Sequence, residues 1–173
     1  MLHLAAQALC RWCPLSSNVR RHQAVAECPI TEGEPVSHLP IRLQPGADLR
    51  RSLEEQAAAG SGLSAFVVAG IGSLTNATIR LAAEQEEAQL SGPFEIISLS
   101  GTLSASGAHL HMSVANKEGQ VVGGHVCYGN IIRTTAEVLL VVLEGWHLSR
   151  APDPTTGYQE LQVKRFGPGE SAA

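Results

Sequence analysis

Hydrophobic residues recur at two different spacings along this chain, and each spacing predicts a different element. Leu49, Leu53 and Ala57 are four positions apart, as on one face of a helix. Asp48 is a suitable N-cap in front of them, and Gly60 is suited to end the helix. This pattern predicts one helix over about residues 49–59.

Alternating or continuous apolar runs, bounded by turn residues, predict strands on both sides of this helix. The first run, residues 38–43, contains Pro40, which cannot donate a ladder hydrogen bond and therefore predicts an edge strand. The other predicted strands cover residues 65–71, 77–82, 94–99, 108–115, 120–127, 136–143 and 160–164. Many strands with one main helix predict an α+β domain with a largely antiparallel sheet.

This domain is expected to span residues 38–165, between two segments of different composition. Residues 1–37 are a predicted leader and linker, and residues 166–173 a predicted disordered tail. The first 26 residues contain Arg but no Asp or Glu, as in a mitochondrial presequence. The expected location is nevertheless the cytoplasm, with mitochondrial targeting by this leader as the alternative. No apolar run reaches the ~18 residues that a membrane span needs.

Composition and charge narrow the function classes. Hydrophobic residues make up 44% of the chain and charged residues 16%, which allows a sizeable core and excludes wholesale disorder. Lys and Arg number 12 against 16 Asp and Glu, for a net charge of −4. Domains that grip the DNA backbone through their own surface are usually basic, so the charge argues against autonomous DNA binding.

Two short segments on neighbouring predicted strands carry the residues best suited to bind a metal. One is His109-Leu-His111, and the other is Gly123-Gly-His125. Residues i and i+2 of a strand share a face, so His109 and His111 project together. The paired glycines permit close approach of a ligand or another backbone.

The turn between these strands sets their register. Asn116-Lys-Glu-Gly119 fits a type I turn with a G1 bulge, which places His111 opposite His125 and His109 opposite Cys127. Clustered neutral imidazoles suit zinc or a similar divalent transition metal. Three histidines with an open position are typical of a catalytic or exchangeable site, whereas Cys127 as a fourth ligand would close a structural one. A solvent-facing polar stripe is the alternative interpretation.

Glu137 is a second candidate for a role beside the histidines. It lies on an otherwise apolar predicted strand, where burial penalises an unpaired charge. It is suited to hold a histidine tautomer or to act as a general base. A structural role beside Arg133 or Arg80 is the alternative.

Several spaced motifs together resemble the plant and prokaryote conserved (PPC) domain over about residues 38–164. The motifs are Gly92-Pro-Phe-Glu-Ile-Ile97, Ser98-Leu-Ser-Gly-Thr102, His109-Leu-His111, Gly119, Gly123-Gly-His125, Arg133-Thr-Thr-Ala-Glu-Val138 and Asp153-Pro-Thr-Thr-Gly-Tyr-Gln-Glu-Leu161. The resemblance implies a mixed α/β fold that assembles into a homotrimer. It also implies a metal held by His109, His111 and His125, as in several prokaryotic members. In plants the domain accompanies AT-hooks, which grip DNA.

Two departures from the family bear on partners. The chain contains no Arg-Gly-Arg-Pro core of an AT-hook. The plant interaction motif Gly-Arg-Phe-Glu-Ile-Leu reads here Gly92, Pro93, Phe94, Glu95, Ile96, Ile97. Pro93 removes a charge and a backbone donor, which weakens the transfer of partner choice. An ordinary strand start is the alternative interpretation of this hexapeptide.

Three functions are compatible with these observations. The first is a trimeric metal-binding domain that acts as an assembly or regulatory module and associates with DNA only through partners. The second is a direct DNA-binding protein. The third is a zinc-dependent, hydrolase-like enzyme that uses the three histidines on an unidentified small molecule, with no catalytic residue assigned.

Overall fold

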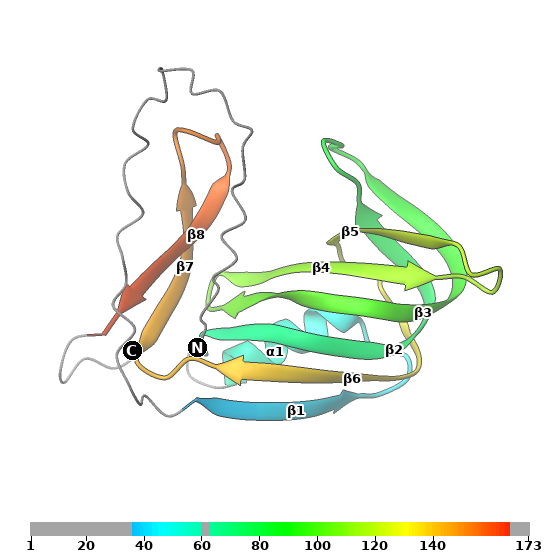
Figure 1. The fold of residues 1–173 in the computed structure, drawn as a ribbon, viewed down its shortest axis with the longest axis horizontal. Coiled ribbons are helices and arrows are strands. Elements are labelled where there is room, and N and C mark those ends of the chain that lie inside the picture. The colour runs from blue at the N-terminus through cyan, green and yellow to red at the C-terminus, as the bar shows by residue number, and fades with distance from the viewer. Residues whose placement is uncertain (1–35, 60–62, 167–173) are drawn as a thin grey trace, which may run out of the picture. The chain divides into compact units, whose positions relative to one another are not determined.

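The computed structural model describes residues 36–59 and 63–166. These residues all belong to the second of two compact units into which the chain divides, residues 34–173. The leader up to residue 35, Gly60 and the tail from residue 167 lie outside the described residues. The elements in Figure 1 are β1 (Ser37–Leu43), α1 (Leu49–Ala59), β2 (Ala65–Arg80), β3 (Glu87–Ser104), β4 (Gly107–Ala115), β5 (Val121–Val126), β6 (Ile132–Val142), β7 (Trp146–Pro152) and β8 (Gln159–Arg165).

Six strands form one sheet in the order β1-β6-β2-β3-β4-β5, and β7 pairs with β8 in a separate hairpin. All of these pairings are antiparallel. With α1 as the helix of the described residues, this confirms the expected α+β class and the largely antiparallel sheet. Helix α1 lies against one face of the large sheet (Figure 1), and the opposite face is called the outer face below.

The predicted strands match the structure with two main differences. As Pro40 indicated, β1 is an edge strand that pairs with β6 alone. Residues 65–71 and 77–82 were expected as separate strands, but they are joined in the 16-residue β2, whose ladder continues through an irregularity between Leu74 and Asn76. No strand was expected at β7, because its sequence WHLSRAP lacks a clear alternation of apolar and polar residues.

Strand β5 pairs with two strands and closes one end of the sheet. Residues 121–125 pair with β4, while His125 and Val126 pair with Arg80 and Ile79 at the end of β2. Strands β2, β3, β4 and β5 therefore form a closed ring at this end. Figure 1 shows β2 and β3 bending out of the plane of the other strands to reach it.

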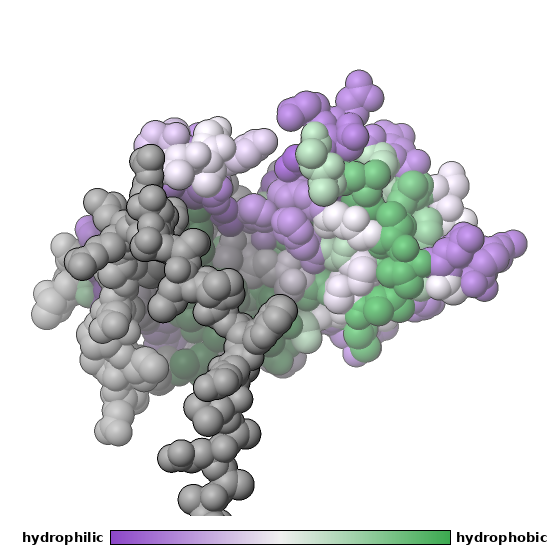
Figure 2. Space-filling view, turned by 45° about the horizontal axis from the view of Figure 1, so that its top comes forward, coloured by the Kyte–Doolittle hydropathy of each residue, from purple (hydrophilic) through white to green (hydrophobic). Residues whose placement is uncertain are grey.

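The outer face exposes several large apolar side chains. On β2, Phe66, Val68 and Ile71 are 40%, 53% and 59% exposed, and Ile97 on β3 is 55% exposed. They alternate with residues such as Val67 that are buried on the helix side. Figure 2 shows a broad area of apolar surface, in green, bordered by hydrophilic residues in purple. We call Phe66, Val68, Ile71 and Ile97 the apolar patch.

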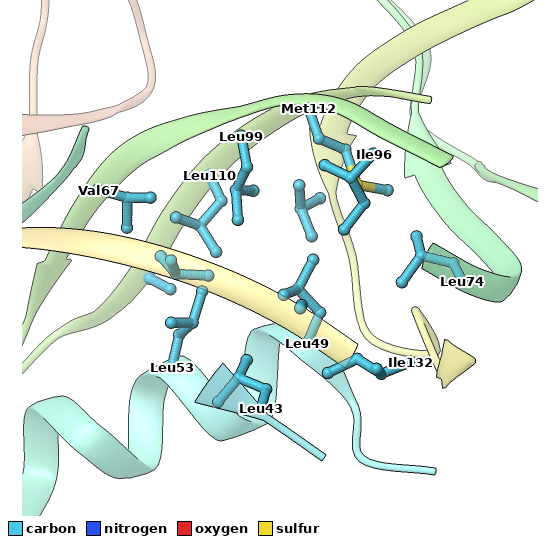
Figure 3. Packing of buried hydrophobic residues seen from close by; sticks show 14 of the residues in the cluster. Leu43, Leu49, Leu53, Val67, Leu74, Ile96, Leu99, Leu110, Met112 and Ile132 are labelled. Carbon is cyan, nitrogen blue, oxygen red and sulfur yellow. The ribbon is translucent and has the colours of Figure 1, made fainter. Parts of the chain in front are cut away.

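The core lies between α1 and the sheet and fixes the strand that carries two of the histidines. Asp48 caps the helix as predicted, because its Oδ1 accepts the backbone N–H of Arg51 at 3.0 Å. Leu49 and Leu53 are fully buried and pack with Leu110 of β4 (Figure 3). Burying each of these side chains stabilises the fold by about 1.5–3 kcal/mol. Within residues 36–59 and 63–166, no helix has the length and apolar character needed to cross a membrane.

Candidate metal centre

The turn between β4 and β5 has the predicted conformation. The N–H of Gly119 donates to the carbonyl of Asn116 at 3.0 Å, and the N–H of Asn116 donates to the carbonyl of Gln120 at 3.0 Å. Gly119 has a φ of 78°, in the left-handed region that glycine adopts without strain. The resulting register sets His111 opposite His125, which confirms the expected pairing.

Close backbone approach around His125 explains the two glycines that precede it. A Cβ at Gly123 would lie 2.7 Å from the carbonyl oxygen of Met112, and one at Gly124 would lie 2.6 Å from that of Arg80. A side chain at either position would therefore push β5 away from β4 or β2. The glycines therefore allow His125 to pair with β4 and with β2 at the same time.

The three histidines converge on one small volume. The Nε2 atoms of His109 and His111 are 3.1 Å apart. The ring centre of His125 lies 4.9 Å from that of His109 and 5.5 Å from that of His111. One ring nitrogen of each histidine lies within 4.8 Å of the others. Tetrahedral zinc with Zn–N bonds of about 2.0–2.1 Å needs nitrogens about 3.3 Å apart, so small side-chain rotations fit this donor set to an ion.

Electrostatics keeps at least two of these imidazoles in the form that binds metals. Burial lowers the pKa of His125 to about 4, and the neighbouring His109, Arg80 and Arg50 act in the same direction. Burial also lowers the pKa of His109, with the positive charge of Arg150 as the next cause. Both rings are therefore neutral at pH 7, with a lone pair free for an ion.

Cys127 does not join the histidines, although the register predicted from the turn placed it opposite His109. The pairing of β5 with β4 stops at His125, and the N–H of Cys127 instead donates to the carbonyl of Thr78 on β2 at 3.1 Å. The thiol is buried and lies 3.7 Å from the carbonyl oxygen of His125. Burial raises its pKa, and Glu87 adds to this. The cluster of ligand atoms contains the three histidines without Cys127.

Glu137 also lies away from the cluster. It stands on β6 opposite Arg42 of β1 and Ile71 of β2, with β2 and β3 between it and the histidine strand β4. Its side chain is exposed, so burial does not penalise its charge as the sequence suggested. The structure does not bring it within reach of a histidine or of Arg80.

The hexapeptide from Gly92 to Ile97 lies within β3, outside the histidine cluster. Phe94 and Ile96 are buried in the core, while Glu95 is exposed. This is the inward and outward alternation expected of a strand. Ile97 is exposed and belongs to the apolar patch.

Arg50 on α1 holds the two strands that carry the histidines, and the sequence did not single it out. Its Nη1 donates to the carbonyl of Val126 at 2.9 Å, and its Nη2 donates to the carbonyl of Ala108 at 3.0 Å. These residues adjoin His125 and His109. The guanidinium thus joins β4 and β5 at the point where their own pairing ends.

Glu54, one helical turn further, completes this connection. Its Oε1 accepts Nε of Arg50 at 3.0 Å and the N–H of Ala108 at 3.1 Å, and its Oε2 accepts the Tyr128 hydroxyl at 2.8 Å. Burial raises the pKa of Glu54, but the hydrogen bonds from Tyr128, Ala108 and Arg50 outweigh it, so the net pKa lies below its usual value. The carboxylate therefore stays ionised. We call Arg50, Glu54 and Tyr128 the clamp.

A cavity of about 720 Å³ opens beside the histidines. The loop after β2, residues 81–85, forms one wall. The β7–β8 hairpin forms another through Arg150, Tyr158, Gln159 and Glu160. Clefts of this volume accommodate small organic molecules.

Comparison with known proteins gives relatives for this fold. The bifunctional protein GlmU of Synechococcus sp. (strain JA-3-3Ab) is 44% identical over 126 residues, which are 73% of this chain and 20% of that protein. This chain thus spans about a fifth of the length of the curated relatives it matches.

Two solved structures match over most of their own length. A hypothetical protein of Salmonella cholerae-suis (Salmonella enterica) is 33% identical with a TM-score of 0.74, covering 77% of this chain and 96% of that chain. A metal-containing protein of Archaeoglobus fulgidus is 30% identical with a TM-score of 0.64, covering 73% of this chain and 93% of that chain.

The family model that matches describes the Plants and Prokaryotes Conserved (PCC) domain, and it matches residues 30–144. These residues include strands β1 to β6, the turn at Gly119 and all three histidines, but not the β7–β8 hairpin. The match confirms the resemblance found in the sequence motifs: this chain belongs to the Plants and Prokaryotes Conserved (PCC) domain family.

Proposed function

We propose that this chain is a metal-binding PCC domain that assembles into a homotrimer and works as an assembly or regulatory module. The convergence of His109, His111 and His125 on one volume carries this proposal. The Archaeoglobus fulgidus relative, described as metal-containing, supports it at 30% identity. A zinc or similar divalent ion held by three imidazoles would supply Lewis-acid polarisation of a ligand oxygen.

Self-assembly rests on the apolar patch. Single exposed apolar side chains are normal on protein surfaces, but neighbouring ones rarely gather without a partner. Ile71 also lines a groove of about 480 Å³ together with Leu139 of the adjacent β6 and Pro40 of β1, the next strand along the sheet. A second copy of the chain is the occupant we propose, because the family resemblance implies a homotrimer.

Association with DNA is proposed to run through partners rather than through this surface. The net charge of −4 opposes contact with phosphate backbones. We therefore expect no retention on duplex DNA even at about 50 mM salt, where non-specific binding is strong. Retention that falls steeply with salt would instead favour direct DNA binding.

Metal content and mass, measured on the same samples, test the proposal. The variants are His109→Ala/His125→Ala and, as a matched control, His38→Ala, which removes an exposed histidine on β1 outside the cluster. We expect about one ion per subunit in the wild type and the control, and none in the double variant. Light scattering is expected to give three subunits for all. Absence of metal after incubation with zinc would overturn the metal site, and a monomeric wild type would overturn the assembly.

A further inference from the structure

Two half-buried arginines line the cavity beside the histidines without a carboxylate partner. Among the described residues, the ion pairs are Arg50 with Glu54 and Lys117 with Glu118. Arg80 and Arg150 take part in neither, although both line the cavity. Guanidinium groups that are partly desolvated and not paired are well suited to receive an anion.

Each of these arginines stands next to one histidine. Arg80 is the cross-strand partner of His125 in the β2–β5 ladder. Arg150 donates from Nη2 to the hydroxyl of Thr102 at 3.0 Å, and Thr102 is the cross-strand partner of His109. The hairpin is thereby tied to the strand beside the cluster.

Both arginines keep donors for a ligand. Nη1 of Arg150 donates to the carbonyl of Gln159 at 3.4 Å, and Nη1 of Arg80 donates to the carbonyl of Glu84 at 3.2 Å. A guanidinium has five N–H donors, so several stay available on each side chain. Backbone carbonyls orient these groups but leave their charge in place.

The charge balance of the cavity depends on the ion. Glu84 and Glu160 line the same cavity and equal the two arginines in number. A divalent ion on the histidines therefore leaves two surplus positive charges. The carboxylate of Glu160 is engaged by the Thr156 hydroxyl at 2.9 Å, at the hairpin turn.

Resting on the proposed metal centre, we infer that this cavity binds a small organic molecule through a carboxylate or phosphate group held between the ion and the guanidiniums of Arg150 and Arg80. The volume of about 720 Å³ exceeds what an inorganic ion needs, and Leu81 and Ala82 offer apolar contact for the carbon part. Arg150 lies on β7, outside residues 30–144 that the family model matches.

Cobalt-loaded full-length protein tests the inference, because the visible spectrum of Co(II) responds when an anion reaches the ion. The spectrum is titrated with inorganic phosphate and, in parallel, with acetate. We expect a saturable change in the wild type, and the anion with the lower dissociation constant identifies the preferred group. Arg150→Gln and Arg80→Gln are each expected to weaken it about 10-fold or more with unchanged cobalt content. Arg133→Gln, an exposed arginine on β6 outside the cavity, is the control.

The outcomes separate this inference from the proposed function. Failure to bind cobalt overturns the metal centre and, with it, the inference. A cobalt-loaded protein whose spectrum neither anion changes overturns the inference alone. A change of equal affinity in wild type and both arginine variants shows an anion bound by the ion without the guanidiniums, which also overturns it. Thermal unfolding of each variant identifies any that fails to fold. If one arginine variant does not fold, the affinity of the other one tests the inference.

Discussion

The histidine cluster and the apolar patch adjoin on the outer face of one sheet, yet they are built in opposite ways. Thr102 of β3 lies opposite His109 on one side and opposite Phe66 on the other, and cross-strand partners share a face. Around the histidines, the clamp holds the backbone carbonyls of Ala108 and Val126, and Arg150 of the hairpin holds the Thr102 side chain, all by hydrogen bonds. In the apolar patch, the exposed side chains are hydrocarbon and form no hydrogen bonds of their own.

This difference shows what each region is suited to bind. An ion requires donors fixed within a fraction of an ångström, so rigid support for the histidines matters there. A protein surface requires area and complementary shape, and individual side chains can adjust to it. If the two regions have these separate roles, changes in one should leave the other's function intact.

A charge in the apolar patch gives the largest expected effect. Ile71 is 59% exposed in the single chain, and in the proposed trimer Ile71→Asp would bury an unpaired carboxylate at the interface. We expect a loss of about 3–5 kcal/mol of association free energy, so that light scattering gives a monomer. Metal content should stay at the wild-type value.

Val163→Asp is the matched control for this change. Val163 is also apolar and 56% exposed, but it lies on β8 outside the apolar patch. The control should remain trimeric. If Ile71→Asp stays trimeric as well, the patch is not the assembly surface.

Removing the clamp should weaken the metal centre while leaving assembly intact. Arg50→Met keeps the aliphatic stem but leaves the carbonyls of Ala108 and Val126 without their guanidinium donor. We expect a loss of about 2–4 kcal/mol in the free energy of unfolding, measured in urea. Metal affinity, measured against a competing chelator, should fall about 10- to 100-fold, as for other groups that orient ligands.

Arg51→Met serves as the control for the clamp. Arg51 is the next residue on α1 and lies over the same Tyr128 ring, with its guanidinium carbon 5.4 Å from the ring centre. It has no bond to Ala108 or Val126 among the described contacts. Equal losses in both variants would assign the effect to the helix surface rather than to the clamp.

Local sequence features predicted the parts of the site that local geometry determines. Gly119 and Asn116 specified the turn, the turn specified the register, and alternation along β4 put His109 and His111 on one face. Each step involves residues close in the sequence. The same reasoning predicted Pro40 at an edge and Asp48 at a helix cap.

The remaining parts depend on contacts between distant residues. Cys127 was misplaced because β5 leaves β4 for β2 just after His125, and this crossing depends on the curvature of the whole sheet. Arg50 bonds to carbonyls 58 and 76 positions away, so no pattern of neighbouring residues could single it out. Arg150 reaches the cavity from β7, the strand of the hairpin that the sequence pattern did not predict.

The smallest expected effect is the response of the free energy of unfolding to acid, which should depend on the histidine cluster and not on the apolar patch. In the metal-free protein, burial holds the pKa of His125 at about 4 against 6.5 in its ordinary state. Between these values the unfolded chain binds a proton that the folded chain does not, so stability falls as the pH drops from 6.5 to 4 and then levels off. Because the ring is partly exposed, solvent screening reduces the full effect to about 2 kcal/mol.

Urea unfolding of the metal-free protein across this pH range measures how steeply the free energy of unfolding falls. The His125→Gln variant shows how much of that fall is due to His125. Glutamine keeps a polar side chain of similar size but does not titrate, so the variant should lose most of the decline between pH 6.5 and 4. His109, whose pKa burial also lowers, should account for part of what remains. Arg51→Met lies outside the cluster, adds no titratable group and should retain the wild-type fall in this interval. An unchanged slope in His125→Gln would show that the buried imidazole is not the group that senses acid.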